Sequence, residues 1–269
     1  MKILVTGATG NIGRLVVDEL LALGATDVRA LTVDPARAAL PPSVEVARGY
    51  LGRPETLPAA FAGVDRVYLA PLLDTVEEAT RLAAEAGVRH IVDLAGAAGS
   101  SWPPIERAVE ACGVPWTHLE AGEFMTNAAI WAPQIRAGDV VGDAYPDEAN
   151  PMIAPADIAA VAARVLLDGA VHEGRSYQLT GPRTLTRRER IEEIGRALGR
   201  SLTVETTGHD RAVADLAPAM GPHAEWYLAG IGASVAAGPR PPTTTVADLT
   251  GRPGTTFRAW ADQNTALFR

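Results

Sequence analysis

The chain has 269 residues, of which 47% are hydrophobic and 21% charged, and its formal net charge at pH 7 is -8. This length supports a substantial core in one large or two small domains, and the acidic balance argues against nucleic acid or an anionic membrane surface as the main partner. Cys112 is the only cysteine, which excludes disulfides and thiolate metal sites. Because no apolar run has the length of a membrane span and the chain starts with a strand, we expect a cytoplasmic protein with no membrane partner and no metal.

Residues 2–24 read as a strand, a glycine-rich turn and a helix. Residues 3–5 are an unbroken apolar run, typical of a strand buried on both faces. Three glycines follow at intervals of three, and the next residues have the apolar spacing of a helix. This order points the unpaired N–H groups of a helix N-terminus at one place, which suits a pyrophosphate, although a tight turn alone would also explain the glycines. The residues predicted to hold a dinucleotide there are Gly7, Thr9, Gly10, Asn11, Ile12 and Gly13.

Strands and helices then alternate along the first half of the chain. Strands are predicted at 28–33, 44–47, 64–70, 90–95 and 115–119, with helices at 57–61, 75–86 and 104–112. This alternation predicts an α/β fold with a Rossmann-like, doubly wound parallel sheet. Ligands of such sheets gather at the carboxyl ends of the strands. Further cofactor contacts are therefore expected from Asp34, Tyr50, Leu51, Ala70, Pro71 and Ala95.

Asp34 bears on the choice between NAD and NADP. It lies about 20 residues past the last glycine, where an acid can accept a hydrogen bond from the ribose 2′-OH. It can equally close a turn before Pro35. Arg37 offers the alternative of a contact to a 2′-phosphate. The acid favours NAD weakly over NADP.

The second half of the chain has a looser pattern. A strand is predicted at 140–145, a helix at 158–167, one more strand of the sheet at 177–179 and helices at 185–198 and 257–268. Thr186 and Glu189 have the spacing of a capping box at the start of one of these helices. We predict a dinucleotide-binding core over residues 1–158 and a smaller C-terminal lobe over residues 159–269, from which the strand near 177–179 returns to the core sheet.

Five motifs together resemble the NmrA-like atypical short-chain dehydrogenases, over nearly the whole chain. They are Val-Thr-Gly-Ala-Thr-Gly-Asn-Ile-Gly at 5–13, Gly-Val-Pro-Trp-Thr-His-Leu at 113–119, Gly-Glu-Phe-Met-Thr-Asn at 122–127, Ala-Asp-Ile-Ala at 156–159 and Tyr-Gln-Leu-Thr-Gly-Pro at 177–182. The resemblance implies a Rossmann fold with a small C-terminal lobe and a bound NAD(P). That family includes NAD(P)H-dependent quinone and dye reductases, and also regulators that bind the dinucleotide without turning it over.

Three positions depart from the family pattern. Val33 stands where the family often has an arginine that reads the 2′-phosphate, and Tyr50 stands where an aspartate near the adenine is common. Tyr50 could stack on or flank the adenine instead. Glu120-Ala121-Gly122 replaces a usual Arg-Pro-Gly, which places an acid at the mouth of the implied substrate site.

The proton relay of ordinary short-chain dehydrogenases is missing. Their Tyr-x-x-x-Lys pair uses the lysine to lower the tyrosine pKa, but Lys2 is the only lysine here and follows none of the tyrosines. Hydride addition to a quinone yields a delocalised phenolate, so such an acceptor needs orientation more than an acid. We therefore expect an NAD(P)H-dependent oxidoreductase that reduces a quinone-like or aromatic polyketide carbonyl.

Several residues are candidates for this chemistry. The predicted catalytic residues are Glu120, Glu123 and Asp93, and the predicted substrate contacts are Trp102, Phe124, Asn127 and Trp131. Each has a plainer interpretation: a solvated loop or helix-terminal charge for the glutamates, and packing for the aromatic residues. Asp93 lies among apolar residues of a strand, so its side chain must have partners.

Two other functions stay open from the sequence. One is an oxygenase-type biosynthetic enzyme, in which the reduced aromatic substrate reacts with O2. The other is a non-catalytic NAD(P)-binding redox sensor that signals to a protein partner. The expected form is a monomer or a homodimer.

Overall fold

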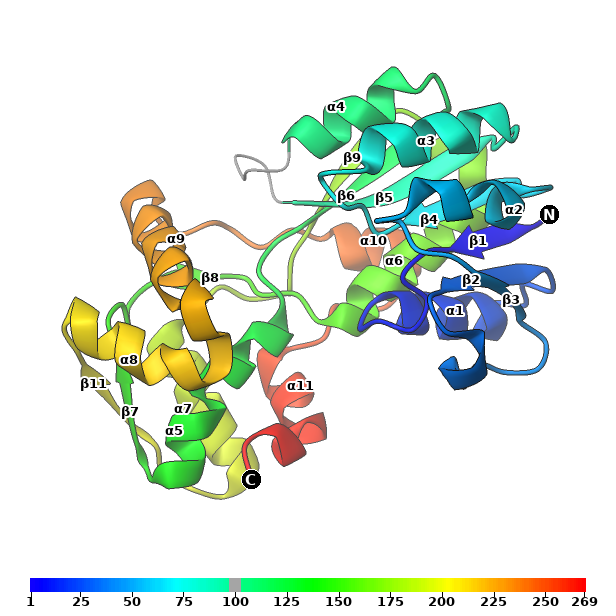
Figure 1. Ribbon diagram of the computed structural model, residues 1–269. Helices are drawn as coiled ribbons and strands as arrows, with labels where there is room; N and C mark the ends of the chain where they lie inside the picture. Colours follow the sequence, from blue (N-terminus) through cyan, green and yellow to red (C-terminus); the bar gives the residue numbers. More distant parts are fainter. Residues whose placement is uncertain (97–102) are drawn as a thin grey trace. The chain divides into compact units, whose positions relative to one another are not determined.

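The computed structural model describes residues 1–96 and 103–269 of the chain (Figure 1). These residues form two compact units. The first unit comprises Met1–Gly122, Pro155–Leu179 and Thr245–Arg252, and the second comprises Glu123–Ala154, Thr180–Thr244 and Pro253–Arg269. This division differs from the predicted boundary after residue 158, which falls inside a helix of the first unit, Pro155–Asp168.

The first unit is built on a parallel sheet, which confirms the predicted α/β class. In the described residues the sheet has seven strands, in the order β3-β2-β1-β4-β5-β6-β9. Their bounds are β1 Ile3–Val5, β2 Val28–Thr32, β3 Glu45–Arg48, β4 Arg66–Leu69, β5 His90–Gly96, β6 Trp116–Ala121 and β9 Arg175–Leu179. The order reverses at β1, because β2 and β4 pair with its two sides. In doubly wound sheets this switch point is where ligands bind.

Helices cover both faces of this sheet, which is why its central strands are apolar without alternation. In Figure 1, α1 and α6 lie on one face and α3 and α4 on the other. Helix α6 is rich in alanine and buried along most of its length, as expected for a helix enclosed on several sides. The helices of this unit are α1 Gly13–Ala22, α2 Pro58–Phe61, α3 Val76–Glu85, α4 Pro103–Ala111, α6 Pro155–Asp168 and α10 Thr245–Thr250.

The second unit is mostly helical and has its own core. Two short sheets accompany the helices: β7 (Val140–Asp143) pairs in parallel with β11 (Thr203–Thr206), and β8 (Ala149–Asn150) pairs antiparallel with β10 (Leu185–Thr186). The helices are α5 Ala132–Ala137, α7 Arg187–Leu198, α8 His209–Met220, α9 Ala224–Ala237 and α11 Phe257–Gln263. Their apolar faces enclose a core that includes Trp131, Ile135, Ile191, Phe257 and Trp260.

The capping box of α7 is confirmed. Thr186 accepts a hydrogen bond from the backbone N–H of Glu189, and the Glu189 carboxylate accepts one from the backbone N–H of Thr186. At the other end of the helix, Gly199 adopts the left-handed conformation at φ +70°. Both ends of α7 are therefore defined by local chemistry that the sequence displays.

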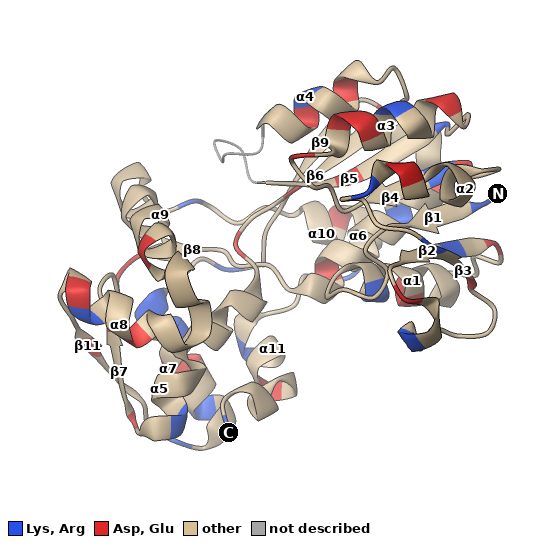
Figure 2. Ribbon diagram, viewed as in Figure 1, with Lys and Arg blue, Asp and Glu red and all other residues tan. Residues whose placement is uncertain are grey.

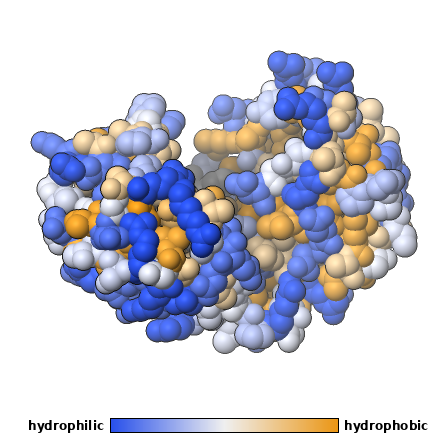
Figure 3. Space-filling model, turned by 90° about the horizontal axis from the view of Figure 1, so that it is seen from below, coloured by the Kyte–Doolittle hydropathy of each residue, from blue (hydrophilic) through white to orange (hydrophobic). Residues whose placement is uncertain are grey.

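The surface of both units is mixed in character. Figure 2 shows acidic and basic residues interspersed, as on α3, where Arg81 forms ion pairs with Glu78 and Glu85. On the face displayed in Figure 3, hydrophobic residues form several patches that hydrophilic residues border. Among residues 1–96 and 103–269, no helix combines the length and the apolarity that crossing a membrane requires.

Candidate functional site

The turn after β1 is a tight glycine corner, formed by Gly7, Gly10 and Gly13. Gly7 adopts φ +59°, and the N–H of Gly10 donates to its carbonyl oxygen at 2.8 Å. A Cβ added to Gly13 would lie 2.6 Å from the carbonyl carbon of Gly7 and closer still to its oxygen. The first turn of α1 therefore packs directly on the backbone of the corner, and only glycine permits this contact.

The helix end at this corner is open to an anion. Within the described part of the chain, no side chain caps the N-terminus of α1, and its first turn contains no acidic residue. Thr9, Gly10 and Asn11 are exposed, whereas Ala8 and Ile12 are buried. Helix N-termini of this kind bind phosphate groups through backbone N–H groups and the helix dipole.

Thr6, which was not among the predicted site residues, fixes the corner to the neighbouring strand. Its hydroxyl donates to the carbonyl oxygen of Tyr68 at 3.0 Å and accepts from the N–H of Ala70 at 2.8 Å. A Cβ on Gly7 would also touch the Cβ of Ala70 at 3.4 Å. The structure thus brings the predicted residues Gly7 and Ala70 together. The signal in the sequence was a polar residue at the end of a buried strand.

Asp34 follows the end of β2 and closes a turn before Pro35, which was the alternative interpretation of this residue. The Asp34 carboxylate accepts from the N–H of Ala36 at 3.1 Å and so starts a short 3-10 helix, Pro35–Arg37. Both Asp34 and Arg37 are exposed. The guanidinium of Arg14, from α1, donates to the carbonyl oxygens of Ala38 and Ala39 and ties this segment to the helix.

The remaining predicted cofactor residues differ in how far their side chains are exposed. Leu51 is buried in the core between the sheet and α3, so its side chain serves packing. The neighbouring Tyr50 is exposed. Pro71 is half-buried after β4, and Ala95 is buried near the end of β5.

Asp93 lies in the interior of the first unit. Its Oδ1 is 2.7 Å from Nδ1 of His118 on the adjacent strand, and Nε2 of His118 is 3.5 Å from a carboxylate oxygen of Glu110. Burial raises the pKa of Asp93. Although burial alone disfavours a charged imidazole, the hydrogen bond to Asp93 raises the pKa of His118. This contact gives each of the two buried polar side chains one partner, whereas Oδ2 of Asp93 has no hydrogen bond among the described residues. Asp93 is thus engaged with His118 on the neighbouring strand.

Glu120 does lie at the edge where ligands are expected. It is half-buried on β6, and its register partner on β5 is Ala95. The carboxyl ends of parallel strands share one edge of a sheet. Glu120 is therefore on the same edge as Ala95 and the glycine corner.

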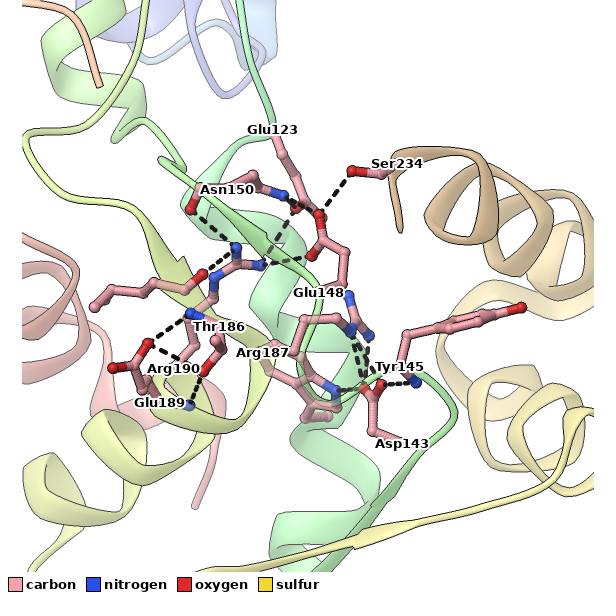
Figure 4. Close-up of polar contacts among 12 residues, drawn as sticks. Glu123, Asp143, Tyr145, Glu148, Asn150, Thr186, Arg187, Glu189, Arg190 and Ser234 are labelled. Atoms are coloured by element: carbon pink, nitrogen blue, oxygen red, sulfur yellow. Dashed lines mark hydrogen bonds and ion pairs between the residues drawn. The ribbon is translucent and has the colours of Figure 1, made fainter. Parts of the chain in front are cut away.

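Glu123, by contrast, belongs to a polar network inside the second unit (Figure 4). Its carboxylate accepts from the Tyr227 hydroxyl at 2.9 Å and from the Asn150 amide at 2.8 Å, and it lies 3.5 Å from Nη1 of Arg190. The same Nη1 lies 3.8 Å from a carboxylate oxygen of Glu148, which accepts from Ser234 and from Asn150. A single buried guanidinium thus faces two carboxylates.

Trp131 contacts a second buried ion pair in this unit, formed by Arg187 and Asp143. Arg187 makes a bidentate contact with Asp143, whose carboxylate also accepts from the indole N–H of Trp131 at 3.0 Å. The guanidinium of Arg187 lies 4.9 Å from the centroid of the Trp131 ring. Although burial alone would raise it, the pKa of Asp143 is lowered by Arg187. Trp131 therefore packs in the core of the second unit, in agreement with its plainer interpretation.

The other predicted substrate residues are less constrained. Phe124 and Asn127 are both half-buried, and the N–H of Asn127 donates to the carbonyl oxygen of Phe124 at 2.9 Å. Trp102 lies outside the described residues. The two buried arginines, Arg187 and Arg190, were not predicted, although their spacing places them on the helix face that also carries the buried Ile191 and Ile194.

Comparison with known proteins agrees with this geometry. The NAD(P)H-binding domain family matches residues 7–101. The chain is 38% identical to a (4-alkanoyl-5-oxo-2,5-dihydrofuran-3-yl)methyl phosphate reductase of Streptomyces griseus, with 99% of each chain covered. It is 32% identical to an NAD(P)H azoreductase of Xenophilus azovorans, again with 99% of each covered.

Solved structures share the fold. An NADPH-dependent quinone oxidoreductase from Escherichia coli is 25% identical and superposes with a TM-score of 0.85 over 97% of this chain and 98% of that one. NmrA, a negative transcriptional regulator in complex with NAD, shares the fold at 17% identity and a TM-score of 0.73, with 99% of this chain and 96% of that one covered. Together with the parallel sheet and the glycine corner, these similarities show that the chain belongs to the NmrA-like group of atypical short-chain dehydrogenases/reductases, with an NAD(P)H-binding domain.

Proposed function

We propose that this protein is an NAD(P)H-dependent reductase that delivers hydride to a conjugated acceptor, such as a quinone-like or other small aromatic compound. The observation that carries the proposal is the glycine corner beneath the uncapped N-terminus of α1. Because Gly13 packs on Gly7, the N-terminus of α1 begins at the corner, and the N–H groups of its first turn would bind the pyrophosphate. The nicotinamide of a dinucleotide bound in this way supplies the hydride.

The residues present fit the rest of a dinucleotide. Asp34 and Arg37 follow β2, whose carboxyl end is expected to border the ribose. Tyr50 follows β3 and Ala70 follows β4 at the same edge of the sheet. The Asp34 carboxylate is already engaged with the backbone of Ala36, and Arg37 is exposed beside it. This arrangement and the NADPH dependence of the solved quinone oxidoreductase do not support the predicted preference for NAD. We propose that NADPH is accepted at least as well as NADH.

The chemical class of the hydride acceptor is inferred from the absence of a tyrosine–lysine proton relay. The only lysine, Lys2, precedes β1, and its Nζ lies 2.7 Å from the carboxylate of Glu45 and 3.5 Å from that of Asp27. It is therefore held at the amino end of the strand, whereas ligands of the fold bind at the carboxyl end. Without a lysine-assisted acid, the product of hydride addition must stabilise its own negative charge. Delocalisation in a conjugated acceptor provides this.

The names of the relatives support the same chemistry. They describe reduction of an alkanoyl-substituted unsaturated lactone, of azo compounds and, in a solved structure, of quinones. All three are electron-poor conjugated systems. These names describe reductases, so they support reduction and do not support the alternative of net oxygenation. We propose that Glu120 borders the acceptor and helps to orient it.

The experiment is a turnover assay that follows nicotinamide absorbance. NADH and NADPH are offered separately with quinones, an azo dye and an alkanoyl butenolide, in air and under anaerobic conditions. We expect acceptor-dependent oxidation of the dinucleotide that does not require oxygen. Tight binding without turnover on every acceptor would favour the redox-sensor alternative, and activity restricted to aerobic samples would favour oxygenation.

A further inference from the structure

A buried histidine and a buried aspartate form a pair on the face of the sheet that α4 covers. Oδ1 of Asp93 is 2.7 Å from Nδ1 of His118, and the two side chains are 0% and 2% exposed. A carboxylate only accepts hydrogen bonds, so an ionised Asp93 holds a proton on Nδ1. Nε2 is then the nitrogen that can gain or lose a proton, and it makes no hydrogen bond to the described residues.

An acidic side chain of α4 connects this nitrogen with solvent. Oε1 of Glu110 is 3.5 Å from Nε2 of His118, and the Glu110 side chain is 48% exposed. The ring of Trp116 stacks on the imidazole, with 4.1 Å between the ring centroids. Trp116 begins β6 and therefore covers the imidazole toward the amino end of the strand. We expect the imidazole to exchange protons with water through Glu110.

Two further glutamates continue from this contact toward the ligand edge of the sheet. Glu106 precedes Glu110 by one turn of α4, about 6 Å along the helix axis. Glu120 follows His118 by two residues of β6, about 7 Å along the strand and on the same face. Because α4 connects the parallel strands β5 and β6, it runs back against them. The start of α4 and the end of β6 therefore share one edge, which places Glu106 near Glu120.

The charges around Glu106 show the same proximity. Burial raises the pKa of Glu106, the positive charge of His118 opposes this, and the negative charge of Glu120 adds to it. Glu106 and Glu120 are both half-buried. Two neighbouring carboxyl groups retain a proton more readily than one, because like charges disfavour the ionisation of both. The groups between solvent and the ligand edge can thus each carry a proton.

We infer that His118 and Glu106 pass protons to Glu120, which donates one to the reduced acceptor. This inference rests on the proposed reductase function. The hydride of NAD(P)H brings both electrons and one hydrogen, and it leaves a negative charge on the acceptor. Protonated Glu120 gives its O–H proton to this anion and becomes a carboxylate. It regains a proton from Glu106, which His118 supplies in turn, and water restores the imidazolium. Glu120 is the catalytic acid, and Asp93 is a positioning residue that keeps the imidazole charged.

His118 determines how this supply of protons depends on pH. Its ordinary pKa is about 6.5, the value nearest to neutrality among these groups. Although burial alone lowers the pKa of His118, the hydrogen bond to Asp93 raises it. The titratable groups around the pair are all acids, namely Tyr68, Asp93, Cys112, Glu106, Glu110 and Glu120. Ser176, the register partner of His118 on β9, is uncharged. Since the protonated imidazole is the donor, kcat should be level at low pH and fall as the pH rises through the pKa of His118.

The test is the pH dependence of kcat at saturating NADPH, with an acceptor that the wild type reduces. Glu120→Gln should lower kcat by about 100-fold or more, the usual contribution of a general acid. Glu106→Gln should lower kcat, and His118→Gln should lower it and abolish its fall with rising pH. Asp93→Asn should move this fall to lower pH, because it removes the charge that favours the imidazolium. The KM for NADPH should stay unchanged in all four variants.

NMR titration of the imidazole groups gives a second readout that needs no turnover. The chain has five histidines, and the signals lost in His118→Gln assign His118. We expect His118 to titrate above its ordinary pKa in the wild type and at lower pH in Asp93→Asn. His209→Gln is the matched control, because His209 lies 2.8 Å from the carboxylate of Glu225 but is exposed on α8 of the second unit. It should leave kcat and its pH dependence unchanged.

The outcomes distinguish this inference from the proposed function. Circular dichroism and thermal unfolding verify each variant, and the half-buried Glu106→Gln serves if a variant of the buried pair does not fold. Wild-type kcat at every pH in Glu106→Gln would overturn the proton supply and keep the reductase proposal, as would an unchanged pH dependence in a folded Asp93→Asn. A wild type that binds NADPH and reduces no acceptor would overturn both.

Discussion

Replacement of Gly13 by alanine tests the basis of the nucleotide site. Gly13 is the first residue of α1. Its added Cβ would lie within 3.0 Å of three backbone atoms, the carbonyl carbon and oxygen of Gly7 and the Cα of Ala8. Backbone atoms cannot rotate away as a side chain can, so either α1 or the corner must move by close to an ångström.

The size of the effect follows from this geometry. Overpacking by one methyl group costs about 1–3 kcal/mol, and the better helix propensity of alanine returns at most about 1 kcal/mol. We therefore expect Gly13→Ala to lower the free energy of unfolding by about 1–2 kcal/mol. Since the movement displaces the N–H groups that face the pyrophosphate, dinucleotide affinity should fall by about tenfold or more.

The assay is titration with NADPH by calorimetry or nicotinamide fluorescence, with thermal unfolding measured in parallel. Gly230→Ala is the matched control. Gly230 lies in α9, and its added Cβ meets open space among the described residues, so this variant should keep wild-type affinity and be as stable or slightly more stable. Wild-type dinucleotide affinity in Gly13→Ala would refute the reasoning, because the corner would then not be what holds the pyrophosphate.

Three further variants test the polar contacts that support the two units, each by chemical denaturation. Thr6→Val removes both bonds between the corner and β4 and should cost about 1–3 kcal/mol; no loss would mean that Thr6 does not tie the strands together. Asp143→Ala leaves the buried guanidinium of Arg187 unpaired and should cost about 3–5 kcal/mol at pH 7. The pKa of Asp143 is lower in the folded protein than in the unfolded chain. The stabilisation by its carboxylate is therefore fully present above the pKa of an unfolded aspartate, about 3.9, and is lost as the pH falls through the folded-state pKa. On acidification, Asp143→Ala should thus lose less stability than the wild type. Thr186→Ala removes the cap of α7 and should cost about 1 kcal/mol, and an unchanged midpoint would contradict the capping box.

The sequence by itself determined those features whose causes are local. Apolar runs and their breaks predicted most of the strands of the sheet, since a strand buried on both faces must be apolar throughout. The glycine corner was predictable because close backbone packing requires glycine, and the structure requires it at Gly13. The capping box of Thr186 and Glu189 was predictable because both partners lie within one turn.

The tertiary structure alone decided which distant residues meet. Asp93 finds His118 because β5 and β6 pair in a particular register, and Glu123 finds Tyr227, more than a hundred residues away. Neither pairing leaves a periodic trace in the sequence. The division into units has the same origin: α10 contacts α6 and β9 of the first unit although it follows a long segment of the second. Such contacts depend on the packing of whole elements, which local propensity and spacing do not encode.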